Sequence, residues 1–238
     1  MKAIIFDFDN TLEKWLPFEE EVEAHLAREV SQTYGLDADA FKKEFDRIKV
    51  DYLESHSFPQ DYGRDVWFSE ALAHFGVNDV DVQPLVEHYW NLLVDLVEPF
   101  PGTHETLQKL KDEGYLLGLL SDGDGVVRQY KDRRIRKLCL EEYFDAIVTS
   151  DELGVNKPNP RVFREITFRL GVSAHECVMV GDNPPKDLIS AKELGFVTVW
   201  QKEDISPRAR KLSFDYVDYE VENILEVYGL VTQTIEKK

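Results

Sequence analysis

The pattern of apolar residues changes along the chain and predicts two kinds of structure. Residues 2–6, with the sequence KAIIF, form a short apolar run that precedes an acidic residue and is typical of a buried strand. Between residues 19 and 96, apolar residues recur at helical spacing in four segments, with no convincing strand between them. This part of the chain therefore predicts a group of packed helices.

From Pro99 onward, short apolar runs alternate with segments of helical spacing. Residues 101–114 begin with Pro-Gly-Thr and end in Gly, as helices often do. The apolar runs that follow are YLLGLL, DAIVTS, ECVMVG and FVTVW, and helices are predicted near residues 125–138, 159–170 and 185–194. This alternation is typical of a parallel sheet with helices on both faces. The predicted fold class is α/β, a doubly wound, Rossmann-like parallel sheet with an inserted all-helical domain.

The helical segments follow directly on the first predicted strand, so they interrupt the α/β part of the chain. We predict a core made of residues 1–13 and 98–238, and a helical cap domain made of residues 14–97. A chain of 238 residues is long enough for these two units.

Composition and charge exclude several classes of partner. The net charge of −18 disfavours binding to nucleic acid and to anionic membranes. The longest apolar runs are far shorter than a membrane span, and acidic residues within the first ten positions argue against a secretory signal. We therefore expect a cytoplasmic protein, a monomer or small homo-oligomer. The histidines show no HExxH motif or paired spacing, so the sequence predicts no zinc site.

Polar and acidic residues follow the predicted strands at their carboxyl ends. In sheets of this kind, ligands bind beyond those ends, near the point where the strand order reverses. The candidates occur in four short segments along the chain. They are Asp7, Asp9 and Thr11 after the first strand, Ser121 and Asp122 after YLLGLL, Lys157 after DAIVTS and a loop, and Asp182 and Asp187 after ECVMVG.

These segments resemble the sequence motifs of the haloacid dehalogenase superfamily in its phosphatase branch. FDFDNTL is similar to the DxDxT motif, LLSDG to the second motif, GVNKPNP to the lysine motif and VMVGDNPPKD to the GDxxxxD motif. EPFPGTHETLQKLK also resembles the return of the chain from cap to core. The resemblance covers nearly the whole chain, and four motifs in order with compatible spacing form a specific signal.

The resemblance implies a phosphatase that uses Mg²⁺ and an aspartyl-phosphate intermediate. A phosphomonoester dianion repels an attacking carboxylate, so cations must neutralise charge around it. By resemblance, Asp7 is the nucleophile and a metal ligand, and Asp182 is a second carboxylate ligand. Asp9 is expected to give its backbone carbonyl to the metal and to act as the general acid and base.

The remaining motif residues are expected around the phosphate and behind the metal ligands. By resemblance, Ser121, Asp122 with its adjoining backbone amide, and Lys157 bind the phosphate, although Asp122 adds a negative charge where many relatives carry Asn. Thr11 and Asp187 are expected behind the ligands, where Asp187 holds a metal-bound water or Lys157. A first-turn acid on a helix is also an ordinary structural feature, which leaves a second interpretation of Asp187 open.

Residues of the cap loops are candidates for contacts with the leaving group. An arginine such as Arg64 suits a carboxylate or phosphate, although it could equally be a surface or capping residue, and Trp67 has the spacing of a core residue. The candidates are Lys14, Trp15, His56, Phe58, Tyr62, Arg64 and Trp67. The expected partner is a small phosphorylated metabolite; small sugar phosphates, phosphoglycolate, glyceraldehyde phosphate and phosphoserine all fit.

Three other functions compete with the phosphatase interpretation. A phosphomutase would use the same residues and return the phosphoryl group to a sugar. A 2-haloacid dehalogenase needs neither magnesium nor an acid at the position of Asp9, so the Asp there favours phosphoryl chemistry. A binding module that kept only the fold would have lost at least one motif residue, and all are present.

Overall fold

The computed structural model contains a six-stranded sheet in which all neighbouring strands are parallel. It describes residues 1–55, 63–123, 129–203 and 212–235. The strand order is β5-β4-β1-β6-β7-β8, so β1 lies in the interior of the sheet and the order reverses on either side of it. The strands are β1 (Ala3–Phe6), β4 (Leu116–Ser121), β5 (Ala146–Thr149), β6 (Cys177–Gly181), β7 (Val197–Gln201) and β8 (Tyr219–Val221).

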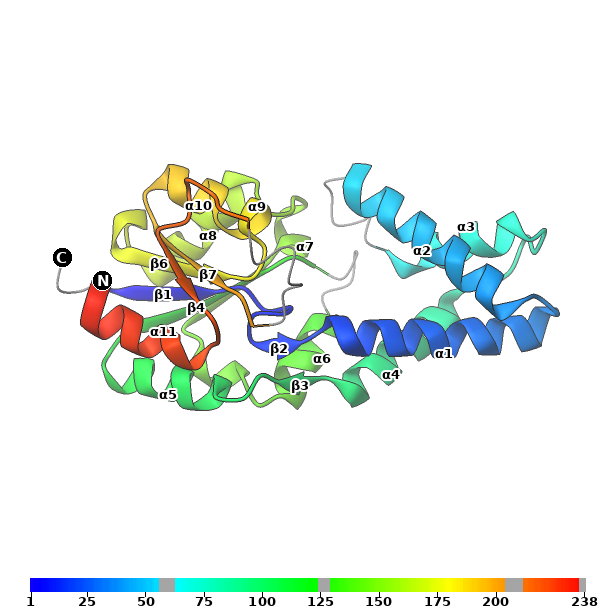
Figure 1. Cartoon of the computed structure of the whole chain (residues 1–238), viewed down its shortest axis with the longest axis horizontal. Coiled ribbons are helices and arrows are strands. Elements are labelled where there is room, and N and C mark those ends of the chain that lie inside the picture. Colours follow the sequence, from blue (N-terminus) through cyan, green and yellow to red (C-terminus); the bar gives the residue numbers. More distant parts are fainter. Residues whose placement is uncertain (56–62, 124–128, 204–211, 236–238) are drawn as a thin grey trace.

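Both faces of this sheet are buried, which explains why its strands are continuous apolar runs. Ile4 and Phe6 pack into one hydrophobic cluster, whereas Ala3 and Ile5 pack into a second cluster on the other face. Figure 1 shows helices on both faces of the sheet. One face carries α5 (Thr103–Asp112) and α11 (Leu225–Leu230), and the other carries α8 (Pro160–Leu170) and α10 (Ile189–Leu194).

Shorter elements complete the α/β part. They are α6 (Gln129–Lys137), α7 (Ser150–Leu153), α9 (Pro184–Asp187), the 3-10 turns η2 (Glu141–Tyr143) and η3 (Ala174–Glu176), and the π-helical turn η5 (Val231–Ile235).

Between β1 and the rest of the sheet, the described residues form four helices that make up a second group, called here the helical block. They are α1 (Leu16–Tyr34), α2 (Ala38–Ser55), α3 (Arg64–His74) and α4 (Gln83–Leu96). Pro17 stands in the first turn of α1, and the helix ends at Gly35, whose φ of 67° lies in the left-handed region that favours glycine. Aromatic rings fill the interior of the block; Phe45 and Phe68, for example, lie with ring centroids 4.8 Å apart.

A short antiparallel ribbon joins the helical block to the sheet. It pairs β2 (Glu13–Lys14) with β3 (Glu98–Pro99), where the chain leaves the core and returns to it. Asn10, with a φ of 58°, accepts hydrogen bonds from the backbone N–H groups of Trp15 (3.2 Å) and Leu16 (3.0 Å). The loop after β1 therefore fixes the start of α1.

The predicted fold class is confirmed: a parallel sheet flanked by helices with a helical insertion. The sequence did not predict β2, β3 or β8, because strands of two or three residues are too short to show a period. In the parts of the chain that the structure describes, every helix is either too short or too polar to cross a lipid bilayer.

Candidate active site

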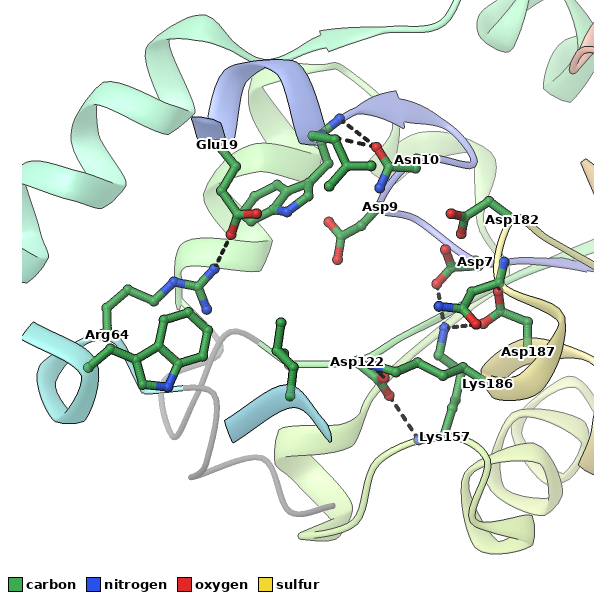
Figure 2. A pocket seen from close by; sticks show the side chains of 16 residues that line it. Asp7, Asp9, Asn10, Glu19, Arg64, Asp122, Lys157, Asp182, Lys186 and Asp187 are labelled. Atoms are coloured by element: carbon green, nitrogen blue, oxygen red, sulfur yellow. Dashed lines mark hydrogen bonds and ion pairs between the residues drawn. The ribbon is translucent and has the colours of Figure 1, made fainter. Parts of the chain in front are cut away.

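The sequence candidates converge at the carboxyl ends of β1, β4 and β6, which are neighbours in the sheet. A cavity of about 210 Å³ lies there, between the sheet and the helical block (Figure 2). Its core side is lined by Asp7, Asp9, Asn10, Asp122, Gly123, Lys157, Asp182, Asn183, Lys186 and Asp187, and its other side by Trp15, Leu16, Glu19, Leu53, Arg64 and Trp67. Among the predicted site residues, Thr11 and Ser121 lie outside this lining.

Asp7 lies at the bottom of the cavity, and its side chain is 6% exposed. Its backbone N–H donates to the carbonyl of Val180 (2.9 Å), which ties the end of β1 to β6. One carboxylate oxygen accepts a hydrogen bond from the Thr11 hydroxyl (3.1 Å), and the other pairs with the Lys157 ammonium. Burial raises the pKa of Asp7 to about 7, even though Lys157 acts in the opposite direction. The charged form of this carboxylate thus needs cations beside it.

Lys157 joins Asp7 to Asp187. Its Nζ lies 2.7 Å from Asp187 Oδ1 and 3.3 Å from the carbonyl of Leu120. Burial would lower the pKa of Lys157, but the carboxylates of Asp187 and Asp7 outweigh it and hold that pKa well above its ordinary value. The ammonium is therefore a fixed positive charge beside Asp7.

Asp187 is placed by close packing against the end of β6. Its second oxygen accepts the backbone N–H of Asn183 (2.9 Å). A Cβ at Gly181 would lie 2.4 Å from that carboxylate, so only glycine leaves room for Asp187 at this point. Of the two interpretations left open by the sequence, the contact with Lys157 supports a place in the site.

Asp182 completes a group of three carboxylates. Thr11 Oγ1 accepts the backbone N–H of Asp182 (3.1 Å), and Trp200 Nε1 donates to the carbonyl of Asp182 (2.9 Å). Burial raises the pKa of Asp182 well above its ordinary value, and repulsion from Asp187 and Asp7 adds to this effect. Asp7 and Asp187 are buried and Asp182 is partly buried, and three carboxylates so close together gain most from a cation between them.

The donor set fits a magnesium ion. Oxygens of Asp7, Asp182 and Asp187 all lie within 4.8 Å of one another, and Mg²⁺ prefers hard oxygen ligands. In this arrangement Asp187 is already bound to Lys157, whereas Figure 2 draws no contact between Asp182 and another labelled side chain. Lys157 contacts both Asp7 and Asp187, so Asp182 is the carboxylate of the three that this lysine leaves open to an ion. The assignment of Asp7, Asp182 and the backbone carbonyl of Asp9 as the metal ligands stays a prediction.

Asp9 has two cationic partners that the sequence did not predict. Lys131 Nζ and Arg134 Nη1, both from α6, each lie 2.6 Å from one of its carboxylate oxygens. Arg134 also pairs with Glu13 in the ribbon. Burial opposes charge on Asp9, but Arg134 and Lys131 outweigh it and hold the pKa of Asp9 well below its ordinary value. In this arrangement Asp9 is an anion.

The sequence contains a signal for a buried Arg134. Tyr130, Arg134 and Leu138 are spaced four residues apart, so one helical face carries a charged residue between two apolar ones. Arg134 and Lys131 are both fully buried. A charge on the apolar face of a predicted helix indicates a buried partner, although not which one.

Ser121 and Asp122 form the loop after β4. The Ser121 hydroxyl is buried and lies 3.1 Å from the carbonyl oxygen of Asp122. The Asp122 carboxylate accepts the backbone N–H of Lys157 (2.9 Å), so it orients the lysine loop. The phosphate contacts predicted for Ser121, Asp122 and Lys157 stay predictions.

The far side of the cavity holds a buried ion pair between Arg64 and Glu19. The Arg64 guanidinium donates to Glu19 Oε1 (2.8 Å) and to the Tyr89 hydroxyl oxygen (3.2 Å). Trp67 is buried in the helical block, and its ring centroid lies 4.4 Å from the guanidinium carbon. Trp67 is thus a core residue of the helical block and also lines the cavity, so the two interpretations of this residue are compatible.

Other cap candidates divide between the cavity and the surface. Trp15 lines the cavity, whereas Lys14 pairs with Glu98 across the ribbon at 3.9 Å. His56, Phe58 and Tyr62 lie outside the described residues. Glu19, which the sequence did not single out, is the acidic residue that the helical block brings to the cavity.

A fold of this topology, with four acidic, hydroxyl and basic motifs at one sheet edge, defines a class of hydrolases. Residues 4–201 match the family model of the haloacid dehalogenase-like hydrolases, and the chain belongs to this family. The family predicted from the sequence is therefore confirmed.

Several relatives within the family are phosphatases. The chain is 30% identical to a glyceraldehyde 3-phosphate phosphatase of Methanopyrus kandleri, over 98% of each chain. It is 28% identical to a ribulose-1,5-bisphosphate 5-phosphatase of Halopiger xanaduensis, over 97% of this chain and 99% of that one. A crystal structure of a haloacid dehalogenase-type phosphatase from Thermococcus onnurineus superposes with a TM-score of 0.75 at 26% identity and covers 98% of both chains. The prediction of a hydrolase related to phosphatases is thus confirmed.

Proposed function

We propose that the chain is a Mg²⁺-dependent phosphatase that hydrolyses a small phosphomonoester through an aspartyl-phosphate on Asp7. The observation that carries this proposal is the group of Asp7, Lys157, Asp182 and Asp187, which line one cavity and of which only Asp182 is partly exposed. Its chemistry is that of phosphoryl transfer: a carboxylate nucleophile, a fixed ammonium and an oxygen-rich cation site.

Asp7 and Lys157 perform the first half of the reaction. Lys157 holds one oxygen of Asp7 and the Thr11 hydroxyl holds the other, so the carboxylate is fixed before substrate arrives. The positive charge of Lys157 also offsets the charge of the incoming phosphate. A magnesium ion held by Asp7, Asp182 and the Asp9 carbonyl would supply further charge neutralisation at the phosphate oxygens.

Asp9 moves the protons. We propose that it protonates the leaving alkoxide and then takes a proton from the water that hydrolyses the phosphoaspartate. Its contacts with Lys131 and Arg134 stabilise the anion, which is the form needed for the second step. The first step needs the protonated form, so the carboxyl group must separate from at least one of these cations when substrate binds.

We also propose that residues 14–97 act as a cap that selects the leaving group. The cap side of the cavity combines the Arg64–Glu19 pair with the rings of Trp15 and Trp67. A guanidinium and a carboxylate can together donate to and accept from hydroxyl or carbonyl groups, and the cavity volume suits a small metabolite. Since Glu19 already balances the charge of Arg64, we infer a leaving group without a second phosphate. Among the relatives' substrates, glyceraldehyde 3-phosphate has this chemistry.

The proposal is tested by release of inorganic phosphate from glyceraldehyde 3-phosphate and from p-nitrophenyl phosphate, with Mg²⁺ and with excess EDTA. The wild type should release phosphate only with Mg²⁺, and Asp7→Asn should be inactive with both substrates. Asn is nearly isosteric with Asp, so retention of the fold can be checked by circular dichroism. Full activity of the wild type in excess EDTA would refute the proposed mechanism.

A further inference from the structure

Two histidines and a glutamate from separate helices converge on the surface of the helical block. His25 and Glu29 lie one turn apart on α1, and His88 lies on α4. The two helices pack side by side along the block (Figure 1). One ligand atom from each of the three side chains lies within 4.8 Å of the others. None of these residues lines the cavity of the candidate active site.

The distances within this group suit coordination of one ion. Nε2 of His25 lies 3.2 Å from one carboxylate oxygen of Glu29, and Nε2 of His88 lies 3.2 Å from the other. In a tetrahedral site with metal–ligand bonds of about 2.0–2.1 Å, neighbouring ligand atoms are roughly 3.4 Å apart. The three side chains therefore need only small rotations to bind a common ion.

The spacing of the histidines along the chain predicted no zinc site, because the two helices bring His88 to His25 and Glu29 only in the folded structure. We propose that these three residues form a binding site for a divalent transition-metal ion, with Zn²⁺ as the representative case. Two imidazoles and one carboxylate favour Zn²⁺, Ni²⁺, Co²⁺ or Cu²⁺, whereas Mg²⁺ and Ca²⁺ prefer sites made of oxygen atoms alone. The side chains are close to half exposed, at 45%, 45% and 44%, so water can occupy the fourth position and the ion can exchange with solvent.

Such an ion would cross-link α1 and α4. The two helices are far apart in sequence, and each also contributes to the cavity region: Glu19 belongs to α1, and Tyr89, which donates to Glu19 (3.2 Å), follows His88 on α4. A ligand that binds only the folded arrangement stabilises it in proportion to its concentration above Kd. The ion therefore stabilises the helical block rather than taking part in phosphoryl transfer.

The helical block provides a matched control for this site. His74 is also an exposed histidine paired with a single glutamate, since its Nδ1 lies 3.3 Å from Glu44 Oε1. No second histidine joins that pair in the metal-binding groups found among the described residues. His74→Gln thus removes an imidazole and its contact with a carboxylate from the same block without touching the proposed site.

The test is isothermal titration of Zn²⁺ into the full-length protein with Mg²⁺ at saturating concentration. The wild type and His74→Gln should bind one more equivalent of Zn²⁺ than His25→Gln and His88→Gln do. Thermal melts should agree: Zn²⁺ at about 100 times Kd should raise Tm of the first two proteins by roughly 5 °C more than that of the other two. Replacement by Co²⁺ should give visible absorption bands that both site variants lose.

Equal stoichiometry and equal Zn²⁺-induced Tm shifts in all four proteins would overturn the proposal, because the three side chains would then make only ordinary surface contacts. All substituted positions are exposed, so the variants should fold, and circular dichroism without Zn²⁺ verifies this. Phosphatase activity with Mg²⁺ is measured in parallel. If the wild type has no phosphatase activity with Mg²⁺, the proposed function is wrong, but the result of the Zn²⁺ titration still stands.

Discussion

Replacement of Arg64 by methionine is the most informative test of the cap side of the cavity. Methionine keeps the length and apolar contacts of the side chain but removes its charge and its hydrogen bonds. The change leaves Glu19, whose side chain is only 9% exposed, without its partner at 2.8 Å. Lys49 remains 3.4 Å from the other carboxylate oxygen and supplies partial compensation.

The expected loss of stability follows from these contacts. Removing one partner of a buried ion pair costs about 3–5 kcal/mol, and the remaining contact with Lys49 places Arg64→Met near the lower end, at about 3 kcal/mol. For a chain of this length, this corresponds to a decrease in Tm of roughly 6–12 °C. The double variant Glu19→Gln/Arg64→Met no longer buries a carboxylate that has lost its closest cation. It should therefore be more stable than Arg64→Met alone.

The effect on activity should depend on the substrate. If Arg64 binds the leaving group, it contributes a charge-assisted hydrogen bond worth about 1.5–3 kcal/mol, so kcat/KM for glyceraldehyde 3-phosphate should fall roughly 10- to 100-fold. Hydrolysis of p-nitrophenyl phosphate, which has no hydroxyl or carbonyl in its leaving group, should change less than about threefold. Arg47→Met is the control, because Arg47 pairs with Glu44 on the exposed face of α2.

The assay measures urea unfolding and kcat/KM for both substrates. The proteins compared are the wild type, Arg64→Met, Glu19→Gln, the double variant Glu19→Gln/Arg64→Met and the control Arg47→Met. An equal fall in kcat/KM for the two substrates would show that Arg64 only maintains the fold. A double variant less stable than Arg64→Met would refute the argument that loss of the Arg64 contact destabilises the charge on Glu19.

Three further predictions concern the core. Protons compete with Mg²⁺ for Asp7, because its raised pKa makes this carboxyl group neutral below about pH 7 without metal. The Kd for Mg²⁺, measured by calorimetry, should therefore increase towards tenfold for each pH unit below pH 7. A Kd that stays constant with pH would contradict this prediction. The stability of the metal-free protein should change in the opposite direction. Because folding raises the pKa of Asp7 from 3.8 to about 7, the free energy of unfolding should fall as the pH rises from about 4 to 7, and saturating Mg²⁺ should reduce that loss. Asp9→Asn should slow the hydrolysis of alkyl phosphates by about 10²–10⁴-fold. With p-nitrophenyl phosphate, rapid-quench experiments on this variant should show a burst of nitrophenolate near one equivalent. If both substrates are slowed equally and no burst appears, Asp9 is not the acid and base.

The sequence allowed prediction of those features that depend on local order along the chain. The alternation of apolar runs and helical segments gave the sheet, and the rule that parallel strands end at one edge brought Asp7, Asp182 and Lys157 together before any contact was known. The motif spacing was also enough to identify the family, which the comparison with relatives confirmed. The roles of these residues in catalysis stay predictions.

The tertiary structure alone decided which side chains meet across elements that are distant in sequence. Lys131 lies 122 residues from Asp9, Arg64 lies 45 residues from Glu19, and His88 reaches Glu29 across two helices. The hydrophobic pattern of a helix indicates which face is buried but not how helices rotate and dock against one another. A buried charge therefore signals that a partner exists, whereas the identity of that partner follows only from the packing of the whole fold.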